Sequence, residues 1–210
     1  TAALAANGGC TIQVNVTSAT PGTYTNTIDA GALATSAGTN AIGASAQVQF
    51  VEWPTNSDLA LTKAIAPNTN QAAGSVQTIT LTWRNGNGSS PVRNVYQCSV
   101  VDTLPAAAYD LAADAPTAGT TPAGYAFSYD AVANTVTYTR TDTTTACETA
   151  TQTATFSVRL KSGVATGSTY TNNVTLTAKT LPSNDPNAAA AATLTKSASA
   201  TVAVTAPSTA

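Results

Sequence analysis

The sequence predicts an all-β protein made of immunoglobulin-like antiparallel β-sandwich modules, one complete and one partial. Three observations predict it: apolar and polar residues alternate with period two, Thr and Ala dominate, and one short phrase occurs twice. The 210 residues include 41 Thr and 43 Ala, while only 9% are charged. Thr favours strands, and low charge without enrichment in Pro, Glu or Lys argues against disorder. We therefore expect folded β modules.

The repeated phrase divides the chain. Thr-Tyr-Thr-Asn occurs at residues 23–26 and returns at residues 169–172, and strand-like Ala-Ser-Ala segments follow at residues 44–50 and 198–204. About a hundred residues of strand-like sequence precede the second copy, but only 22 residues precede the first. A β module without its front strands has open edges and an uncovered core face. The first copy is therefore expected to need a partner.

This division sets the expected domains. Residues 1–51 are the partial module, completed by a neighbour or by sequence outside this chain, and residues 52–57 are a linker. Pro and Asn within the linker are typical of loops. Residues 58–204 are the complete sandwich and residues 205–210 a tail.

Period-two alternation predicts the strands. In the partial module it covers residues 10–17, 23–29 and 44–51, with a loop rich in Gly, Ala, Ser and Thr over residues 31–43. Many short strands separated by turn residues favour a sandwich. The strands expected in the complete module are residues 59–65, 76–84, 91–102, 124–129, 135–140, 153–161, 168–178 and 192–204.

Four short motifs resemble the DUF11 repeat of bacterial surface proteins. The resemblance covers about residues 58–204 as a full repeat and residues 8–51 as a tail. It implies an immunoglobulin-like module of secreted or wall-attached proteins, often in tandem and without an enzymatic role. The motifs are Leu61-Thr-Lys63, Ile79-Thr-Leu81-Thr-Trp83-Arg-Asn85, Val101-Asp102-Thr-Leu104-Pro105 and Gly-Ser-Thr-Tyr170-Thr-Asn172.

Three polar residues share strand faces with apolar ones. Each of them lies an even number of positions from the apolar residues of its strand and therefore points to the same side. We expect all three in the core: Lys63, Asp102 and Asn172. A Lys, an Asp and an Asn that converge there are the ingredients of an intramolecular isopeptide bond, because burial supplies a neutral amine and a protonated acid. Such a bond looks like the crosslink of some Gram-positive pilin and adhesin domains. In the alternative, Lys63 reaches a surface carboxylate, Asp102 caps a turn and Asn172 bonds to backbone.

The three cysteines suit an extracellular protein. Cys98 and Cys147 both lie in the complete module and are expected to form a disulfide, which persists outside the cell. Two buried thiols are the alternative. Cys10 is left over, either unpaired or bridging to another subunit. No CxxC pair occurs, so a metal site is not expected.

Composition excludes several functions. The chain has no His, which rules out Ser-His-Asp and Cys-His catalysis, and we expect neither an enzyme nor a cofactor. A net charge of −2 provides no basic surface patch that would bind nucleic acid. No apolar run reaches the ~18 residues of a membrane-spanning helix. Sequons at Asn15, Asn87 and Asn173 are expected by chance in a chain so rich in Thr.

Two functions remain. The first is a structural subunit at the bacterial cell surface, either a pilus-like filament or a stalk, assembled head-to-tail from copies of itself by β-strand complementation. Residues 1–9 or 192–210 could be the donated segment. The alternative is an adhesin-type module that binds glycan or protein through loops such as residues 105–124, where Tyr109 looks exposed. Trp53 in the linker is a further candidate for an exposed contact.

Overall fold

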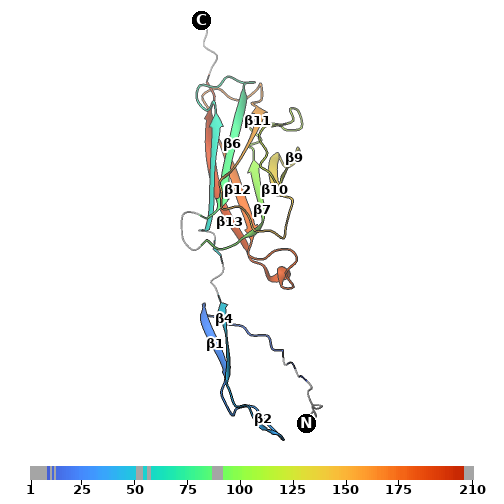
Figure 1. Ribbon diagram of the computed structural model, residues 1–210. Coiled ribbons are helices and arrows are strands. Elements are labelled where there is room, and N and C mark those ends of the chain that lie inside the picture. The colour runs from blue at the N-terminus through green and yellow to red at the C-terminus, as the bar shows by residue number, and fades with distance from the viewer. Residues whose placement is uncertain are drawn as a thin grey trace. The chain divides into compact units, whose positions relative to one another are not determined.

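The computed structural model describes residues 9, 11, 13–50, 54–55, 58–86 and 92–205. The chain divides into two compact units, Thr1–Glu52 and Trp53–Ala210, called unit 1 and unit 2 below. Figure 1 draws the strands of both units. The strands pair antiparallel, and their stacking in unit 2 makes an immunoglobulin-like β-sandwich, so the expected fold class is confirmed.

Unit 2 contains two sheets. The five-stranded sheet has the order β13-β12-β7-β10-β9, and the four-stranded sheet has the order β5-β6-β11-β8. A short 3-10 helix, η2 (Ala188–Ala190), lies between β12 and β13. The strands are β5 (Leu59–Ala66), β6 (Val76–Asn85), β7 (Tyr96–Thr103), β8 (Thr117–Ala118), β9 (Tyr125–Asp130), β10 (Thr135–Arg140), β11 (Gln152–Arg159), β12 (Thr169–Lys179) and β13 (Thr193–Ala203).

The core of unit 2 lies between these sheets. Along β6, β10, β11 and β12, buried residues occur at every second position, as half-buried strands require. Trp83 is buried, as expected, and its indole Nε1 donates a hydrogen bond to the Tyr125 hydroxyl at 3.2 Å. Fully buried side chains from both sheets include Leu59, Ile79, Leu81, Val100, Tyr138, Phe156 and Leu176. Each contributes about 1.5–3 kcal/mol on burial.

β13 is built into unit 2. It pairs with β12 over its whole length and lies beside β5. At its end, the Ala203 amide donates to the Asn68 carbonyl at 2.8 Å, and just after it the Thr205 amide donates to the Gln71 carbonyl at 2.9 Å. The hypothesis that residues 192–210 form a free donor segment is therefore wrong for residues 193–205. Residues 1–8 and 206–210 lie outside the described residues.

One buried asparagine fastens the connection between β7 and β8. Asn134, at a positive φ of 54°, ends the turn between β9 and β10. Its Nδ2 donates to the carbonyls of Leu104 and Tyr109, at 2.9 and 3.3 Å, and its Oδ1 accepts from the Leu111 amide at 3.0 Å. Asn tolerates this backbone conformation better than most residues. One side chain thus makes three hydrogen bonds to a long loop without regular structure.

Unit 1 contains a two-stranded sheet of β1 (Gly22–Ile28) and β4 (Ala44–Phe50). Between them, β2 (Ala34–Thr35) and β3 (Gly38–Thr39) form a small hairpin within the expected loop. The expected strand at residues 10–17 is wrong for residues 11 and 13–17, which are not in a strand. Alternation of residues alone does not make a strand, because the backbone N–H and C=O groups of a strand need hydrogen-bond partners on a neighbouring strand. Residues 10 and 12 lie outside the described residues.

Candidate functional site

One face of the β1–β4 sheet is apolar and exposed. Three pairs of opposed residues mark this face, because alternate residues of a strand point the same way. Tyr24, Ile28 and Val48 on it are 41%, 50% and 40% exposed. An isolated two-stranded sheet is only marginally stable in water. The three pairs are Tyr24 with Val48, Asn26 with Ala46, and Ile28 with Ala44.

The closing strands of unit 2 repeat this pairing. Tyr170 lies opposite Val202, Asn172 opposite Ala200, and Val174 opposite Ala198. The same residue types thus face each other in the same order, except that Val replaces Ile. In unit 2 this face lies on the core, where Asn172, Val174 and Val202 are at most 1% exposed. β1–β4 is therefore the counterpart of β12–β13, with its apolar face uncovered.

Three strands of unit 2 bring Lys63, Asp102 and Asn172 together. Lys63 lies on β5 and its Nζ contacts Asp102 Oδ2 on β7, so the pair crosses from one sheet to the other. Both side chains are inaccessible to solvent, as is Asn172 on β12. Asp102 lies opposite Val174. Asn172 is consequently the diagonal neighbour of Asp102 on the same face.

This arrangement contradicts the three alternatives left open for these residues. Lys63 does not reach solvent, because its side chain has no exposed surface. Asp102 lies within a strand rather than at a turn. The Asn172 amide approaches the Asp102 carboxyl, yet neither of its polar atoms makes a well-formed hydrogen bond to backbone or side chain. The remaining oxygen of that carboxyl, Oδ1, is equally buried and unpaired.

Burial shifts the pKa values of both members of the ion pair toward their uncharged forms. Burial lowers the pKa of the Lys63 amine from 10.5 to about 8, although Asp102 acts in the opposite direction. Burial raises the pKa of the Asp102 carboxyl, although Lys63 and Asn172 oppose this. Transfer of one proton from Lys63 to Asp102 removes both charges without any exchange with solvent. A neutral amine, a protonated acid and an amide then share one dry site.

A disulfide joins Cys98 on β7 to Cys147 in the loop before β11. The two Cα atoms are 6.2 Å apart, and the residues are separated by 49 positions. The Cys147 amide also donates to the Val95 carbonyl at 2.7 Å. The bond thus ties the loop to the five-stranded sheet. Cys10 lies outside the described residues.

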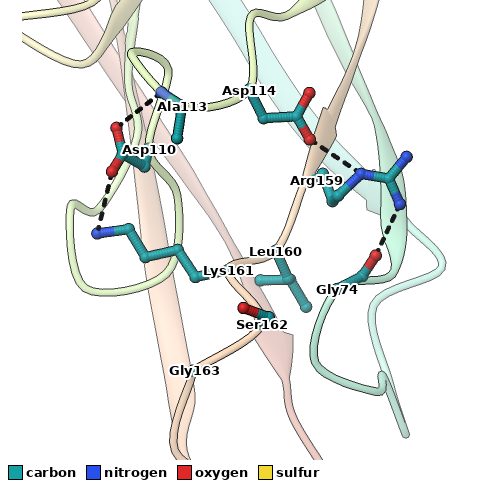
Figure 2. Close-up of a pocket in the computed structure, with 9 residues that line it drawn as sticks. All are labelled: Gly74, Asp110, Ala113, Asp114, Arg159, Leu160, Lys161, Ser162 and Gly163. Carbon is teal, nitrogen blue, oxygen red and sulfur yellow. Dashed lines mark hydrogen bonds and ion pairs between the residues drawn. The ribbon is translucent and has the colours of Figure 1, made fainter.

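A shallow pocket of about 480 Å³ lies between loops of unit 2. Figure 2 shows that its charged side chains face one another. Arg159 Nε donates to Asp114 at 2.9 Å, and Lys161 Nζ is 4.0 Å from Asp110. Arg159 also donates to the Gly74 carbonyl at 2.9 Å. These groups hold the loops together, and none is left pointing at a ligand.

The loop features expected of an adhesin are not as predicted. Tyr109 is only 1% exposed, because it packs into the core and its hydroxyl donates to Gln77 Oε1 at 3.4 Å. The expectation of an exposed Tyr109 is therefore wrong. Asn15 and Asn173 of the sequons are exposed. Trp53 and Asn87 lie outside the described residues.

Within the described ranges, no three or more His, Cys, Asp or Glu side chains gather as a metal site would require. None of the helices there combines the length and apolarity of a membrane crossing.

Residues 1–50 match the family DUF7933, a domain of unknown function, and the matching family is not DUF11. No curated protein matches the chain. A crystal structure of BcpA*(D312A), the major pilin subunit of Bacillus cereus, is similar with 14% identity and a TM-score of 0.47, over 70% of this chain and 40% of that one. The chain thus spans less than half of that pilin.

Two other solved structures are similar. The full-length major pilin SpaD from Corynebacterium diphtheriae has 14% identity and a TM-score of 0.43, over 68% of this chain and 34% of that one. The seventh ScaB type I cohesin from Pseudobacteroides cellulosolvens has 19% identity and a TM-score of 0.43, over 70% of this chain and 94% of that one.

Proposed function

We propose that the chain is a structural subunit of an extracellular, pilus-like assembly on the bacterial surface, in which the β1–β4 sheet of one copy joins unit 2 of the next. The observation that carries this proposal is the match between β1–β4 and β12–β13. The same pairs of residues form a core face in unit 2 and an exposed face in unit 1. A face with the composition of a core is stable when another β structure covers it.

The free edge of β9 is the acceptor in this proposal. Among the residues that the structure describes, β9 pairs only with β10, so its other edge has no partner strand there. Its Phe127 is only partly buried against the core, and its Tyr129 is 45% exposed. Both share a strand face, since they are two positions apart. A sheet added to this edge gains backbone hydrogen bonds and places its apolar face beside these aromatic rings.

The two edge strands of the five-stranded sheet, β9 and β13, differ in whether another segment covers them, as this proposal requires. At the other edge, β13 lies beside β5 and its end bonds to the segment after β5. β9 has no such cover among the described residues. Contact between unit 1 of one copy and unit 2 of the next uses two different surfaces, so it builds an open chain of subunits when the rotation between successive copies does not close into a ring.

An extracellular location suits this role. The Cys98–Cys147 disulfide is stable in oxidising surroundings and is rare in the reducing cytosol.

Sedimentation velocity and electron microscopy of the whole chain test the proposal. The wild type should associate as its concentration rises and should form fibres of constant width. Ile28→Lys/Val48→Lys should remain monomeric, because two ammonium groups on the apolar face cannot be covered without cost. Val92→Lys, a matched change at an exposed apolar residue elsewhere in unit 2, should associate like wild type. A wild type that stays monomeric, or a double variant that still associates, contradicts the proposal.

A further inference from the structure

We propose that Lys63 and Asn172 become joined by an isopeptide bond inside unit 2, and that Asp102 is the catalytic acid for this step. The inference concerns the interior of one unit, so it is independent of the assembly proposed above.

The site contains several buried polar atoms that lack a hydrogen-bond partner. Asp102 Oδ1, Asn172 Oδ1 and Asn172 Nδ2 are all buried without a hydrogen-bond partner. Leaving one such atom unpaired costs about 1–3 kcal/mol, and native structures contain few of them. Three in a single site, next to a buried amine, call for an explanation in the chemistry of the site.

The contacts of Lys63 and Asp102 do not fit an ordinary buried ion pair. Such a pair is tolerated when further hydrogen bonds satisfy its remaining lone pairs and protons. In the described part of the chain, the hydrogen bond that Lys63 donates goes to Asp102 alone. The second carboxylate oxygen receives none. Without reaction, the site keeps the burial cost of both ions and gains little in return.

One condensation resolves these deficits. Lys63 first passes a proton to Asp102, and its neutral Nζ then attacks Cγ of Asn172. The new C–N bond forms while the carbonyl electrons move onto Oδ1, which the protonated carboxyl of Asp102 stabilises. The Asp102 carboxyl group next carries a proton from Nζ to Nδ2, the old Cγ–Nδ2 bond breaks, the carbonyl re-forms and ammonia leaves.

Atoms and charges balance in this reaction. A primary amine and a primary amide become a secondary amide and ammonia, no oxidant or reductant is needed, and Asp102 ends protonated. The product contains one N–H donor and one carbonyl acceptor, which match the acceptor and donor of the protonated Asp102 carboxyl group. The unpaired atom Nδ2 has departed, and the remaining polar atoms have partners within reach.

The position of this bond suits a subunit under tension. The chain enters unit 2 just before β5 and leaves after β13. A bond from Lys63 to Asn172 closes a loop of about 110 residues, and the Cys98–Cys147 disulfide lies within it. Force applied to the two ends of unit 2 would pass through the isopeptide bond and bypass most of the sandwich.

The whole chain contains an internal control. Asn26 belongs to the same Thr-Tyr-Thr-Asn phrase and the same paired position as Asn172, but residues 1–52 include no Lys. Within this chain Asn26 should therefore remain an unmodified amide.

Mass spectrometry of the reduced, purified chain tests the proposal. Loss of ammonia should lower the intact mass by about 17 Da. Succinimide formation at an Asn-Gly pair (Asn7, Asn85 or Asn87) gives the same loss, so proteolysis must also yield a branched peptide that joins Lys63 to Asn172. The full sequence mass in folded protein, or a loss confined to an Asn-Gly peptide, overturns the proposal.

Variants assign the roles. Lys63→Arg keeps the charge but has no amine that can form the bond, so the mass loss should disappear; Lys63→Met serves if Lys63→Arg does not fold. Lys196→Arg, a matched change at an exposed Lys of β13, should retain the full loss. Asp102→Asn, folded by circular dichroism, should form the bond at least about 100-fold more slowly. Bond formation at the wild-type rate in Asp102→Asn would overturn the role of Asp102.

Discussion

Lys63 contacts Asp102 across the interior of unit 2, and neither side chain has any surface exposed to solvent. The pair joins β5 of one sheet to β7 of the other. A strand of period two would ordinarily place an apolar side chain at each of these positions. The pair is therefore the point at which packing alone does not explain the sequence.

Replacing the pair by apolar residues separates a covalent bond from an ion pair. Lys63→Met/Asp102→Leu should lower the free energy of unfolding by about 4 kcal/mol, because a crosslink that closes so long a loop is lost. A simple ion pair predicts the reverse, since well-packed apolar replacements of buried ions are neutral or stabilising. Denaturant titration measures the difference, with Lys196→Met as the control. Unchanged or increased stability of the double variant would contradict the crosslink.

The pH dependence of unfolding gives a second, independent readout. Asn172→Ala leaves Lys63 as a free amine, whose pKa falls from 10.5 to about 8 on folding because of burial. Between these values the unfolded chain holds a proton that the folded chain does not, so the stability of the variant should rise with pH, by about 3 kcal/mol in total. Subtracting the free energy of unfolding of Lys63→Met/Asn172→Ala at each pH removes the contribution of other titrating groups.

The wild type should lack this slope. Once Lys63 is part of an amide, its nitrogen no longer titrates. The free energy of unfolding of the wild type therefore contains no pH-dependent contribution from Lys63. If the free energy of unfolding of the wild type rises between pH 8 and 10.5 as steeply as that of Asn172→Ala, the Lys63 amine is still free.

Asn134 should contribute more to stability than its place in a turn suggests. Asn134→Gly keeps the positive φ but removes three hydrogen bonds to the loop after β7, so the free energy of unfolding should fall by about 2–3 kcal/mol. Asn70→Gly is the matched control, because Asn70 also has a positive φ of 55° but is exposed. Equal effects of the two changes would mean that only backbone conformation matters.

Single-molecule stretching should reveal the two crosslinks separately. In the wild type, unfolding of unit 2 should release only about 40 residues, or about 140 Å of chain. Lys63→Arg should release about 100 residues, or about 360 Å, while the disulfide is intact. Reduction should lengthen the release in Lys63→Arg and leave the wild type unchanged. A release beyond 300 Å in the oxidised wild type would rule out the bond.

The periodic strands were predictable from the sequence, and the loops were not. Alternation predicts residues 59–65 and 135–140 as strands, and β5 and β10 occupy almost the same residues. β8 was missed because it has only two residues, which is too short for alternation to be seen; both of them pair with β11. Tyr109 was judged by its Pro- and Ala-rich surroundings, whereas its ring packs in the core and its carbonyl accepts a hydrogen bond from Asn134. No local pattern carries that information.

The candidate site shows the same limit. Parity within each strand placed Lys63, Asp102 and Asn172 on inward faces, because side-chain direction in a strand follows the period of two. The register between strands and the unpaired state of the amide depend on contacts among β5, β7 and β12, which the sequence does not encode locally. The repeated phrase predicted two related segments, but only pairing revealed that they share a register.

Hydrogen exchange of the whole chain at increasing concentration tests most directly whether another copy covers β1–β4. Protection of residues 22–28 and 44–50 should increase with concentration, together with that of residues 125–130 in β9, whereas β12 and β13 should be protected throughout. Exchange in β1 and β4 that stays fast at every concentration, or protection there without any change in β9, would contradict assembly through these two surfaces.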